Sequence, residues 1–348
     1  MPVKRFDANP LLTPKNVPPT REDLEVYCTI NPGAIRIDDQ VLLLVRVGEK
    51  PHDIPGAIGT LKYDPVSGQT LTIRYKLDDP ELKTVDGRAF FYQDKMLLTS
   101  LSHLRVARSK DMIHWEVEPA PAIEPTTEWE SFGCEDARIT LLEGRYYIAY
   151  TAVSHLGISV MLAVTDDFVK YQKLGIIVPT FNKDVCLFPE KIHGRYVARH
   201  RPYRTAFNDP CIWTAWSPDL VHWGEHSVLL RPVADTWEGD RVGSGAPPIR
   251  TKEGWLEIYH GADVHGQYGL GAMLTELDNP LKIIHKSSRP IMTPEAPYEL
   301  TGVYSQCVFS NGLVVDDDGI ITIFYGAADS VTAAATTTVD EMIAAAKM

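Results

Sequence analysis

The chain has 348 residues, of which 44% are hydrophobic and 23% charged, and its formal net charge is −12. This composition is typical of a globular protein with a sizeable core, and the negative charge argues against a nucleic-acid partner. No run approaches the roughly 20 apolar residues that span a bilayer, and residues 1–7 lead into no apolar signal segment, so no membrane partner is expected. The five cysteines are scattered and contain no C-x-x-C pair, which favours reduced thiols and a cytoplasmic location.

Short apolar runs rich in β-branched and aromatic residues recur along the chain, with turn residues between them. They predict an all-β fold, because no long stretch between residues 19 and 332 has the 3.6-residue period of a helix. One short helix is predicted at the C-terminal end, where Thr338 and Glu341 have capping-box spacing before an apolar run. The clearest strand candidates are residues 41–45, 146–150, 255–259 and 320–325.

A short motif occurs three times: a hydroxyl residue, an Asp two positions later and an aromatic residue six positions later. Each copy follows a predicted strand and precedes another apolar run. The copies recur roughly every 50 to 60 residues, which is the length of one propeller blade, although ordinary hairpins with similar turns are the alternative. The copies are Ser109–Trp115, Thr165–Tyr171 and Ser217–Trp223.

The number of blades stays open between five and six. Candidate middle strands lie near residues 41, 95, 145, 195, 255 and 320, and one of them could pair with the N-terminal strand. No segment is long or polar enough to be a linker between domains. We therefore predict a single domain over residues 1–348, with an N-terminal arm at 1–26 and a C-terminal tail with its helix at 333–348 as the only appendages.

The acidic strand start Cys134–Arg138 is the most informative segment, because familiar nucleophile, phosphate-loop and dinucleotide motifs are missing. Glu135 and Asp136 are adjacent, so on a regular strand they would point to opposite faces and one would face the propeller axis. A strand start with surface charges is the alternative for this segment alone.

Other polar residues lie at comparable positions of the repeat, where burial without partners would be costly. In a propeller they could meet around a water-filled axial funnel, whereas salt bridges within blades are the alternative. Tyr203, Tyr268 and Tyr304 could stack on a sugar, although packing is the more usual role of such residues. The candidate substrate-binding residues are Asn31, Arg46, Glu135, Arg138, Glu190, Lys191, Tyr268 and Asp329.

The charge balance at such a funnel distinguishes two reactions. An inverting glycosidase needs a second carboxylate that activates water, whereas a phosphorylase needs cations that bind phosphate, itself the nucleophile. Lys183, Arg201, Arg241 and His260 supply candidate cations on successive repeats. The sequence therefore favours an oxyanion as co-substrate.

Several ordered motifs between about residues 24 and 332 resemble those of glycoside hydrolase family 130, the mannoside phosphorylases and related mannosidases. The resemblance implies an all-β, five-bladed β-propeller, to which the predicted short C-terminal helix is added. It also implies an inverting reaction at a β-mannoside, and the motif combination looks closest to β-1,2-mannobiose and mannooligosaccharide phosphorylases. The motifs are Asn31-Pro32-Gly33, Glu135–Arg138, Leu187–Ile192, His200-Arg201-Pro202, Gly243–Ile249, Tyr259-His260-Gly261 and Tyr325–Asp329.

The resemblance also implies roles for individual residues. Asp136 would be the general acid, which protonates the glycosidic oxygen through a substrate hydroxyl while phosphate attacks the anomeric carbon and gives α-mannose 1-phosphate. The family's phosphate-binding positions fall on Lys183, Arg201, Arg241 and His260. Lys183 stands where many members have arginine, which changes the geometry of phosphate binding more than its charge.

Two alternatives stay open. Hydrolytic members of the family carry carboxylates in place of phosphate-binding cations, and Glu238 lies only three residues from Arg241, so a β-1,2-mannosidase is the first alternative. A non-catalytic glycan-binding propeller is the second. We expect no metal and no organic cofactor, with inorganic phosphate as co-substrate and small mannosides as the other partners. The sequence leaves open whether the chain forms a homo-oligomer.

Overall fold

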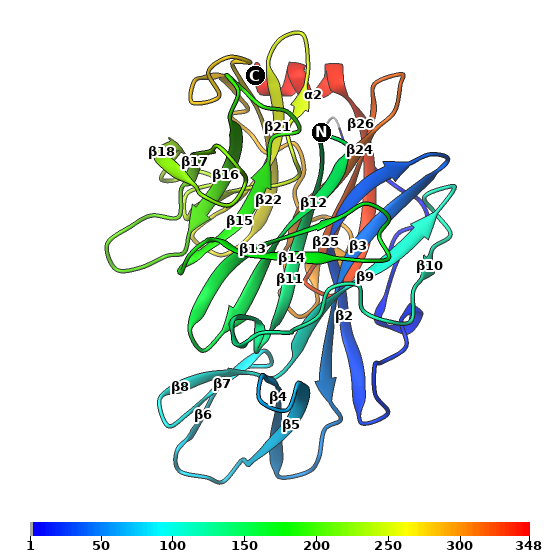
Figure 1. Cartoon of the computed structure of the whole chain (residues 1–348), viewed down its shortest axis with the longest axis vertical. Helices are drawn as coiled ribbons and strands as arrows, with labels where there is room; N and C mark the ends of the chain where they lie inside the picture. The colour runs from blue at the N-terminus through cyan, green and yellow to red at the C-terminus, as the bar shows by residue number, and fades with distance from the viewer. Residues whose placement is uncertain (1–2) are drawn as a thin grey trace.

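The computed structural model describes residues 3–348 and confirms the all-β prediction (Figure 1). The two α-helices among these residues are short, α1 (Pro297–Leu300) and α2 (Val339–Ala346), and two 3-10 turns are η1 (Pro14–Asn16) and η2 (Glu128–Glu130). The strands are β1 (Lys4–Arg5), β2 (Leu24–Ile37), β3 (Gln40–Pro51), β4 (Ala57–Asp64), β5 (Gln69–Lys76), β6 (Leu82–Asp86), β7 (Ala89–Tyr92), β8 (Lys95–Leu98), β9 (Leu101–Ser109), β10 (Glu116–Val117), β11 (Gly133–Leu142), β12 (Arg145–Ser154), β13 (Gly157–Thr165), β14 (Gln172–Val178), β15 (Asn182–Leu187), β16 (Tyr196–Pro202), β17 (Ile212–Ser217), β18 (Gly224–Leu230), β19 (Arg241–Ser244), β20 (Ile249–Arg250), β21 (Trp255–Ala262), β22 (Tyr268–Thr275), β23 (Ile283–Lys286), β24 (Val308–Val315), β25 (Ile320–Ala327) and β26 (Val331–Thr338).

Most strands form antiparallel meanders that follow one another along the chain. Meander I consists of β2, β3, β9 and β10, and meander II consists of β11 to β14. Meander III consists of β15 to β18, meander IV of β19 to β23, and meander V of β24 to β26 with β1 at its outer edge. The unit that repeats in the sequence is therefore one antiparallel meander.

The core lies between neighbouring meanders. One apolar cluster joins meanders I and II through Leu44, Ile139 and Ile148, and another joins meanders IV and V through Leu256 and other residues. The first strand of meander I contacts both the first strand of meander II, β11, and that of meander V, β24. Each meander thus packs on the next, and the last packs on the first.

The expected N-terminal arm and C-terminal tail are built into the sheets rather than appended to them. β1 pairs antiparallel with β26, with Lys4 opposite Thr336 and Arg5 opposite Ala335. Without β1, the outer edge of β26 would expose backbone N–H and C=O groups that lack hydrogen-bond partners. Helix α2 begins where predicted, because Thr338 Oγ1 accepts a hydrogen bond from the Glu341 backbone N–H at 3.1 Å. Its apolar face, which includes Met342, is buried in the core.

Two small sheets interrupt meander I between β3 and β9. One is the hairpin β4–β5 and the other is the three-stranded sheet β6–β7–β8. In Figure 1 they lie together at the end of the molecule opposite to α2. The middle strand predicted near residue 95 is β8, which belongs to this insertion and not to a further meander.

The three-fold motif forms the same turn each time, which confirms that it marks a structural repeat. The aspartate accepts hydrogen bonds from the backbone N–H groups two and three residues later, and the hydroxyl accepts one from the N–H three residues later. The aromatic side chain donates to the carbonyl group three residues earlier. Each turn joins the third and fourth strands of a meander; the aspartates are Asp111, Asp167 and Asp219.

Among the described residues, no helix is long and apolar enough to cross a membrane. The five cysteines are buried free thiols.

Candidate active site

Bulges in the first strands of meanders I, II and III turn polar side chains toward one region. Asn31 in β2, Asp136 in β11 and Asp184 in β15 have positive φ angles of 48°, 53° and 56°. The strand register shifts at each of these places. Residues other than glycine adopt this backbone conformation at a cost, which Asn and Asp tolerate best, and such strain concentrates at functional sites.

The bulge in β11 corrects the expectation that Glu135 and Asp136 face opposite sides. Arg46 in β3 donates to Glu135 Oε1 at 2.8 Å and to Asp136 Oδ1 at 3.2 Å. Asn31 Nδ2 donates to the same Asp136 oxygen at 2.9 Å. A regular strand would separate the two carboxylates, whereas the extra residue of a bulge lets both reach one guanidinium group.

Three carboxyl groups share this part of the site but differ in proton affinity. Burial alone would raise the pKa of Asp136, but the charges of Arg46, Lys183 and Arg138 outweigh it and hold that pKa below its usual range. Burial raises the pKa of Glu135, and the neighbouring Asp136 carboxylate adds to the rise. Asp136 is therefore a carboxylate in the unliganded site at neutral pH.

Asp329 follows the end of β25 and lies near enough to Asp136 for the two charges to interact. Its φ angle is 48°, and burial raises the pKa of its carboxyl group, to which the charge of Asp136 adds. Arg88, in the turn between β6 and β7, opposes this rise, and its guanidinium lies 5.3 Å from the ring centroid of Tyr304. The insertion therefore brings a cation to the site that no sequence motif indicated.

A second cluster surrounds Asp184, a fully buried carboxylate that sequence reasoning missed. Arg201 Nε donates to Asp184 Oδ2 at 2.6 Å, and His260 Nε2 lies 3.3 Å from the same oxygen. Arg138 donates to Asp184 Oδ1 at 3.3 Å. Burial would raise the pKa of Asp184, but Arg201 and His260 hold it well below its usual range. Asp184 therefore holds the predicted phosphate ligands Arg201 and His260 in place.

Arg138 connects the two clusters and is itself buried. It donates to the Asp136 carbonyl oxygen at 3.0 Å and to the Ser244 carbonyl oxygen at 2.9 Å, in addition to Asp184. We predicted that Arg138 binds substrate. In the structure its nitrogen atoms make internal hydrogen bonds, which hold Asp136 and Asp184 relative to one another.

His260 differs from its prediction as a cation. Burial lowers the pKa of His260 to about 4, and the charge of Arg201 adds to that effect while Asp184 opposes it. The imidazole is therefore neutral near pH 7. Gly243 packs against the His260 ring. A β-carbon at this position would collide with His260 Nε2 and with Asp184 Oδ2, so the contact requires glycine.

Arg241 and Lys183 complete the positive side of the site. The Arg241 guanidinium lies 5.1 Å from the ring centroid of Tyr268, and Arg241 Nε is 3.0 Å from Asp240 Oδ2. Tyr268 in turn lies 6.0 Å from the His260 ring. Lys183 is half-buried, and its charge lowers the pKa of both Asp136 and Asp184, which places it between the two clusters.

Glu190 and Lys191 are not brought to this site. Glu190 Oε1 pairs with Arg250 at 2.8 Å, and Lys191 Nζ pairs with Glu143 at 2.7 Å, all with exposed or half-exposed side chains. They follow the end of β15, whereas Asp184 lies near its start. The motif Leu187–Ile192, which contains both residues, therefore ends in a surface turn away from the site.

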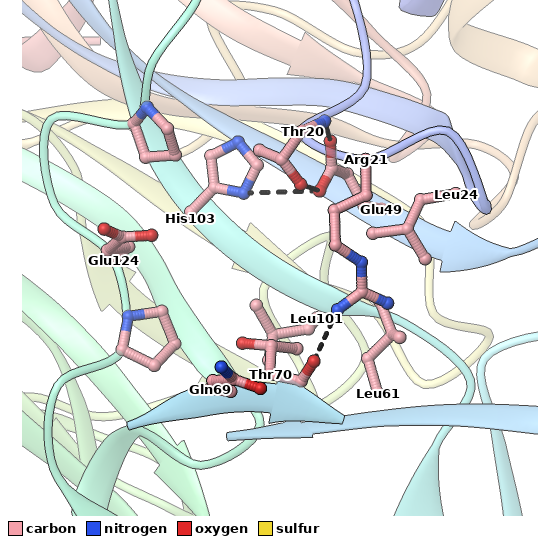
Figure 2. A pocket seen from close by; sticks show the side chains of 12 residues that line it. Thr20, Arg21, Leu24, Glu49, Leu61, Gln69, Thr70, Leu101, His103 and Glu124 are labelled. Carbon is pink, nitrogen blue, oxygen red and sulfur yellow. Dashed lines mark hydrogen bonds and ion pairs between the residues drawn. The ribbon is translucent and has the colours of Figure 1, made fainter. Parts of the chain in front are cut away.

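A cavity of about 440 Å³ lies on the face of β3 opposite to Arg46 (Figure 2). Figure 2 shows Glu49 and His103 side by side in it, with Arg21 reaching to Thr70. Glu49 accepts hydrogen bonds from the Thr20 backbone N–H at 2.6 Å and from its hydroxyl at 2.5 Å. These bonds fasten the N-terminal segment to meander I. Because the cavity lies on the face of β3 opposite to Arg46, it is separate from the candidate active site.

A buried carboxylate near fixed cations, where several β-meanders meet, suits an enzyme that cleaves glycosidic bonds with an acid group and an anion-binding cluster. A profile of glycoside hydrolase family 130, described as β-1,4-mannooligosaccharide phosphorylase, matches residues 84–348. The chain belongs to this family, which confirms the assignment made from its motifs.

Relatives with named activities cover much or all of the chain. The β-1,2-mannobiose phosphorylase of Listeria innocua is 37% identical over 348 residues, which is 99% of this chain and 98% of the relative. A 1,2-β-oligomannan phosphorylase of Thermoanaerobacter sp. is 42% identical over 234 residues, which is 66% of this chain and 77% of the relative. The solved Listeria innocua enzyme with β-1,2-mannobiose superimposes with a TM-score of 0.95 at 36% identity and covers 99% of both chains.

Proposed function

We propose that this enzyme catalyses the inverting phosphorolysis of β-1,2-linked mannobiose or mannooligosaccharides and releases α-mannose 1-phosphate. The observation that carries the proposal is the buried Asp136 carboxylate beside a cluster that contains Arg201, Arg241 and Lys183. The named activities of the Listeria innocua and Thermoanaerobacter relatives support the choice of linkage and of reaction.

Asp136 is the proposed general acid. In the reaction, the bond between the anomeric carbon and the glycosidic oxygen breaks, a phosphate oxygen bonds to that carbon from the opposite face, and the glycosidic oxygen takes a proton. A carboxylate with a lowered pKa must first gain this proton, which is balanced by the proton that hydrogen phosphate loses when it becomes the phosphate ester. Phosphate binding favours the protonated acid, because a dianion beside Lys183 offsets one of the positive charges that lower the pKa of Asp136.

Phosphate is proposed to bind at Arg201, Arg241 and Lys183, with the neutral His260 as a hydrogen-bonding ligand or a support for Asp184. In the part of the chain that the structure describes, only Nε of Arg201 takes part in a hydrogen bond, which leaves its two terminal nitrogens for an anion. Charge-assisted, two-pronged hydrogen bonds of this kind are the ones that arginine makes to phosphate.

The mannosidase alternative requires a carboxylate that can activate water, and Glu238 was the nearest candidate. Glu238 is 2% exposed, accepts a hydrogen bond from Tyr259 OH at 2.7 Å and pairs with Lys286. A carboxylate held by these two partners inside meander IV is not available as a base at the site. This placement favours phosphorolysis over hydrolysis.

Asn31, Arg46, Glu135 and Asp329 are proposed to bind the mannosyl unit that is cleaved, since they surround Asp136. Arg88 and Tyr304 approach the same place from the insertion and from the start of meander V, and we assign them to the acceptor sugar. We further propose that meanders I to V are the blades of a five-bladed propeller, with β1 closing the last blade onto the N-terminus.

The decisive experiment is incubation with β-1,2-mannobiose in the presence and absence of phosphate, with mannose and mannose 1-phosphate measured separately. Phosphorolysis predicts mannose 1-phosphate in a phosphate-dependent reaction. Release of free mannose at an equal rate without phosphate would favour the mannosidase. The proposed chemistry needs no metal or organic cofactor, so dialysis against a chelator should leave the rate unchanged, and restoration by a divalent ion would contradict it.

A further inference from the structure

Three meanders share a buried polar contact that holds their outer strands. A glutamate before or within the start of the meander accepts a hydrogen bond from a tyrosine in the second strand and pairs with a cation in the outermost strand. Each glutamate is at most 2% exposed, so its charge is balanced inside the protein. The sets are Glu130 with Tyr150 and Lys173, Glu238 with Tyr259 and Lys286, and Glu299 with Tyr325 and Arg5.

Meander III departs from this contact at every position. His200 in β16 lies opposite the bulge of the first strand, as Tyr150 does in meander II, and His226 lies in the outermost strand β18. His200 Nδ1 is 3.0 Å from Asn182 Nδ2, and His200 Nε2 is 3.0 Å from His226 Nδ1. Burial lowers the pKa of His200 to about 3, and His226 adds to that effect, so His200 is neutral. Hydrogen bonds among Asn182, His200 and His226 stand where the other three meanders have an ion pair.

A pocket of about 510 Å³ opens at this place. Asn182, His200 and His226 form one part of its wall, and Phe181 and Tyr203 form another. Phe181 is 54% exposed and Tyr203 is 43% exposed. No lysine, arginine, aspartate or glutamate is among the described residues that line it. An anion would find no lysine or arginine here, whereas an uncharged ring with hydroxyl groups finds both hydrogen-bonding partners and aromatic faces.

The pocket opens beside the candidate active site. Because neighbouring residues of a strand point to opposite faces, Asn182 and His200 lie back to back with Lys183 and Arg201. The loop that carries Tyr203 is also tied to the site, since Arg204 donates to the Asp240 carbonyl oxygen at 2.6 Å, directly before Arg241. The pocket and the active site therefore open at the same end of meander III, on opposite faces of its sheet, and the sugar chain would pass over the start of β15.

We propose that this pocket is a second sugar-binding site, which holds a mannosyl unit of a mannooligosaccharide longer than the disaccharide that is cleaved. The choice of sugar rests on the proposed function, whereas the preference for an uncharged ring rests on the pocket alone. The enzyme then prefers longer β-1,2-mannooligosaccharides to mannobiose, because only a longer chain occupies both sites.

The test compares Phe181→Ala, which removes an aromatic wall, with Phe207→Ala as a matched control. Phe207 is 99% exposed and belongs to the loop that follows Tyr203, but it does not line the pocket. Calorimetry without phosphate measures the dissociation constants of β-1,2-mannotetraose and β-1,2-mannobiose. We expect Phe181→Ala to weaken tetraose binding about three- to tenfold, the loss of one aromatic contact, and to leave mannobiose binding unchanged. Phe207→Ala should resemble the wild type with both sugars.

Three results would overturn the proposal. The first is equal tetraose affinity in the wild type and Phe181→Ala, and the second is an equal loss in Phe207→Ala. The third is a change in the association state of Phe181→Ala in analytical ultracentrifugation, which would assign the exposed rings to a contact between copies of the chain. Phosphorolysis of mannobiose by the wild type is measured separately. If that reaction is absent, the proposed function fails, and the calorimetric comparison still decides on the pocket.

Discussion

Replacement of Arg201 by alanine tests the proposed phosphate site most directly. Arg201 Nε is held by Asp184 at 2.6 Å, so the guanidinium is already oriented before phosphate binds. Charge-assisted hydrogen bonds contribute about 1.5 to 3 kcal/mol each, and the loss of one such bond raises the KM for phosphate by about tenfold to a hundredfold. The KM for mannobiose should change much less, because Arg46 and Asn31 hold the sugar side of the site.

A second measurement separates this effect from a general loss of structure. Burial is the main cause of the low pKa of His260, and the charge of Arg201 adds to it. Arg201→Ala should therefore raise the pKa of His260, which can be followed by NMR of the imidazole. Asp184 keeps Arg138 and His260 as partners, so the fold should survive.

Initial rates at varied phosphate and fixed mannobiose provide the assay, with Arg145→Ala as the control. Arg145 has a side chain that is 43% exposed and also pairs with a carboxylate, Asp166, but it lies at the end of β12 that is away from Asp136. An unchanged phosphate KM in Arg201→Ala, or an equal increase in Arg145→Ala, would refute the proposed role.

Three further substitutions test other parts of the site. Asp136→Asn should lower kcat by about 10²- to 10⁴-fold with an unchanged circular dichroism spectrum, and near-normal turnover would exclude Asp136 as the acid. Gly243→Ala places a methyl group against His260 and Asp184, so we expect a loss of about 1 to 3 kcal/mol in urea unfolding, and wild-type stability would contradict this steric argument. Arg88→Ala should raise the KM for mannobiose by about tenfold while the KM for phosphate stays constant, and the reverse pattern would place Arg88 on the phosphate side.

The repeating strand pattern could be predicted from the sequence because it depends on local chemistry. The turn at Asp111 recurs at Asp167 and Asp219, since the same short side chains satisfy the same backbone N–H groups. The cap of the last helix at Thr338 is equally local. The number of meanders could not be read in this way, because the strand near residue 95 has the same pattern as a middle strand but belongs to an insertion.

The candidate site was predictable in its residue types but less so in its geometry. Glu135 and Asp136 face one arginine only because β11 contains a bulge, and nothing in an alternating strand pattern indicates a bulge. Asp184 was missed although it follows Lys183 in the same strand start; its equivalence to Asp136 becomes visible only when the bulges are superimposed. Arg88 carries no local signal, because it reaches the site from an insertion distant in sequence.

The pairing of β1 with β26 has a consequence for synthesis on the ribosome. Lys4 is translated long before its partner Thr336, so β1 stays unpaired until β26 emerges. Earlier meanders can form while translation continues, since their strands are neighbours in sequence. The ring is then completed in one late step, in which Arg5 also meets Glu299. A ribosome that stops before β26 leaves both β1 and β25 without the strand that pairs with both.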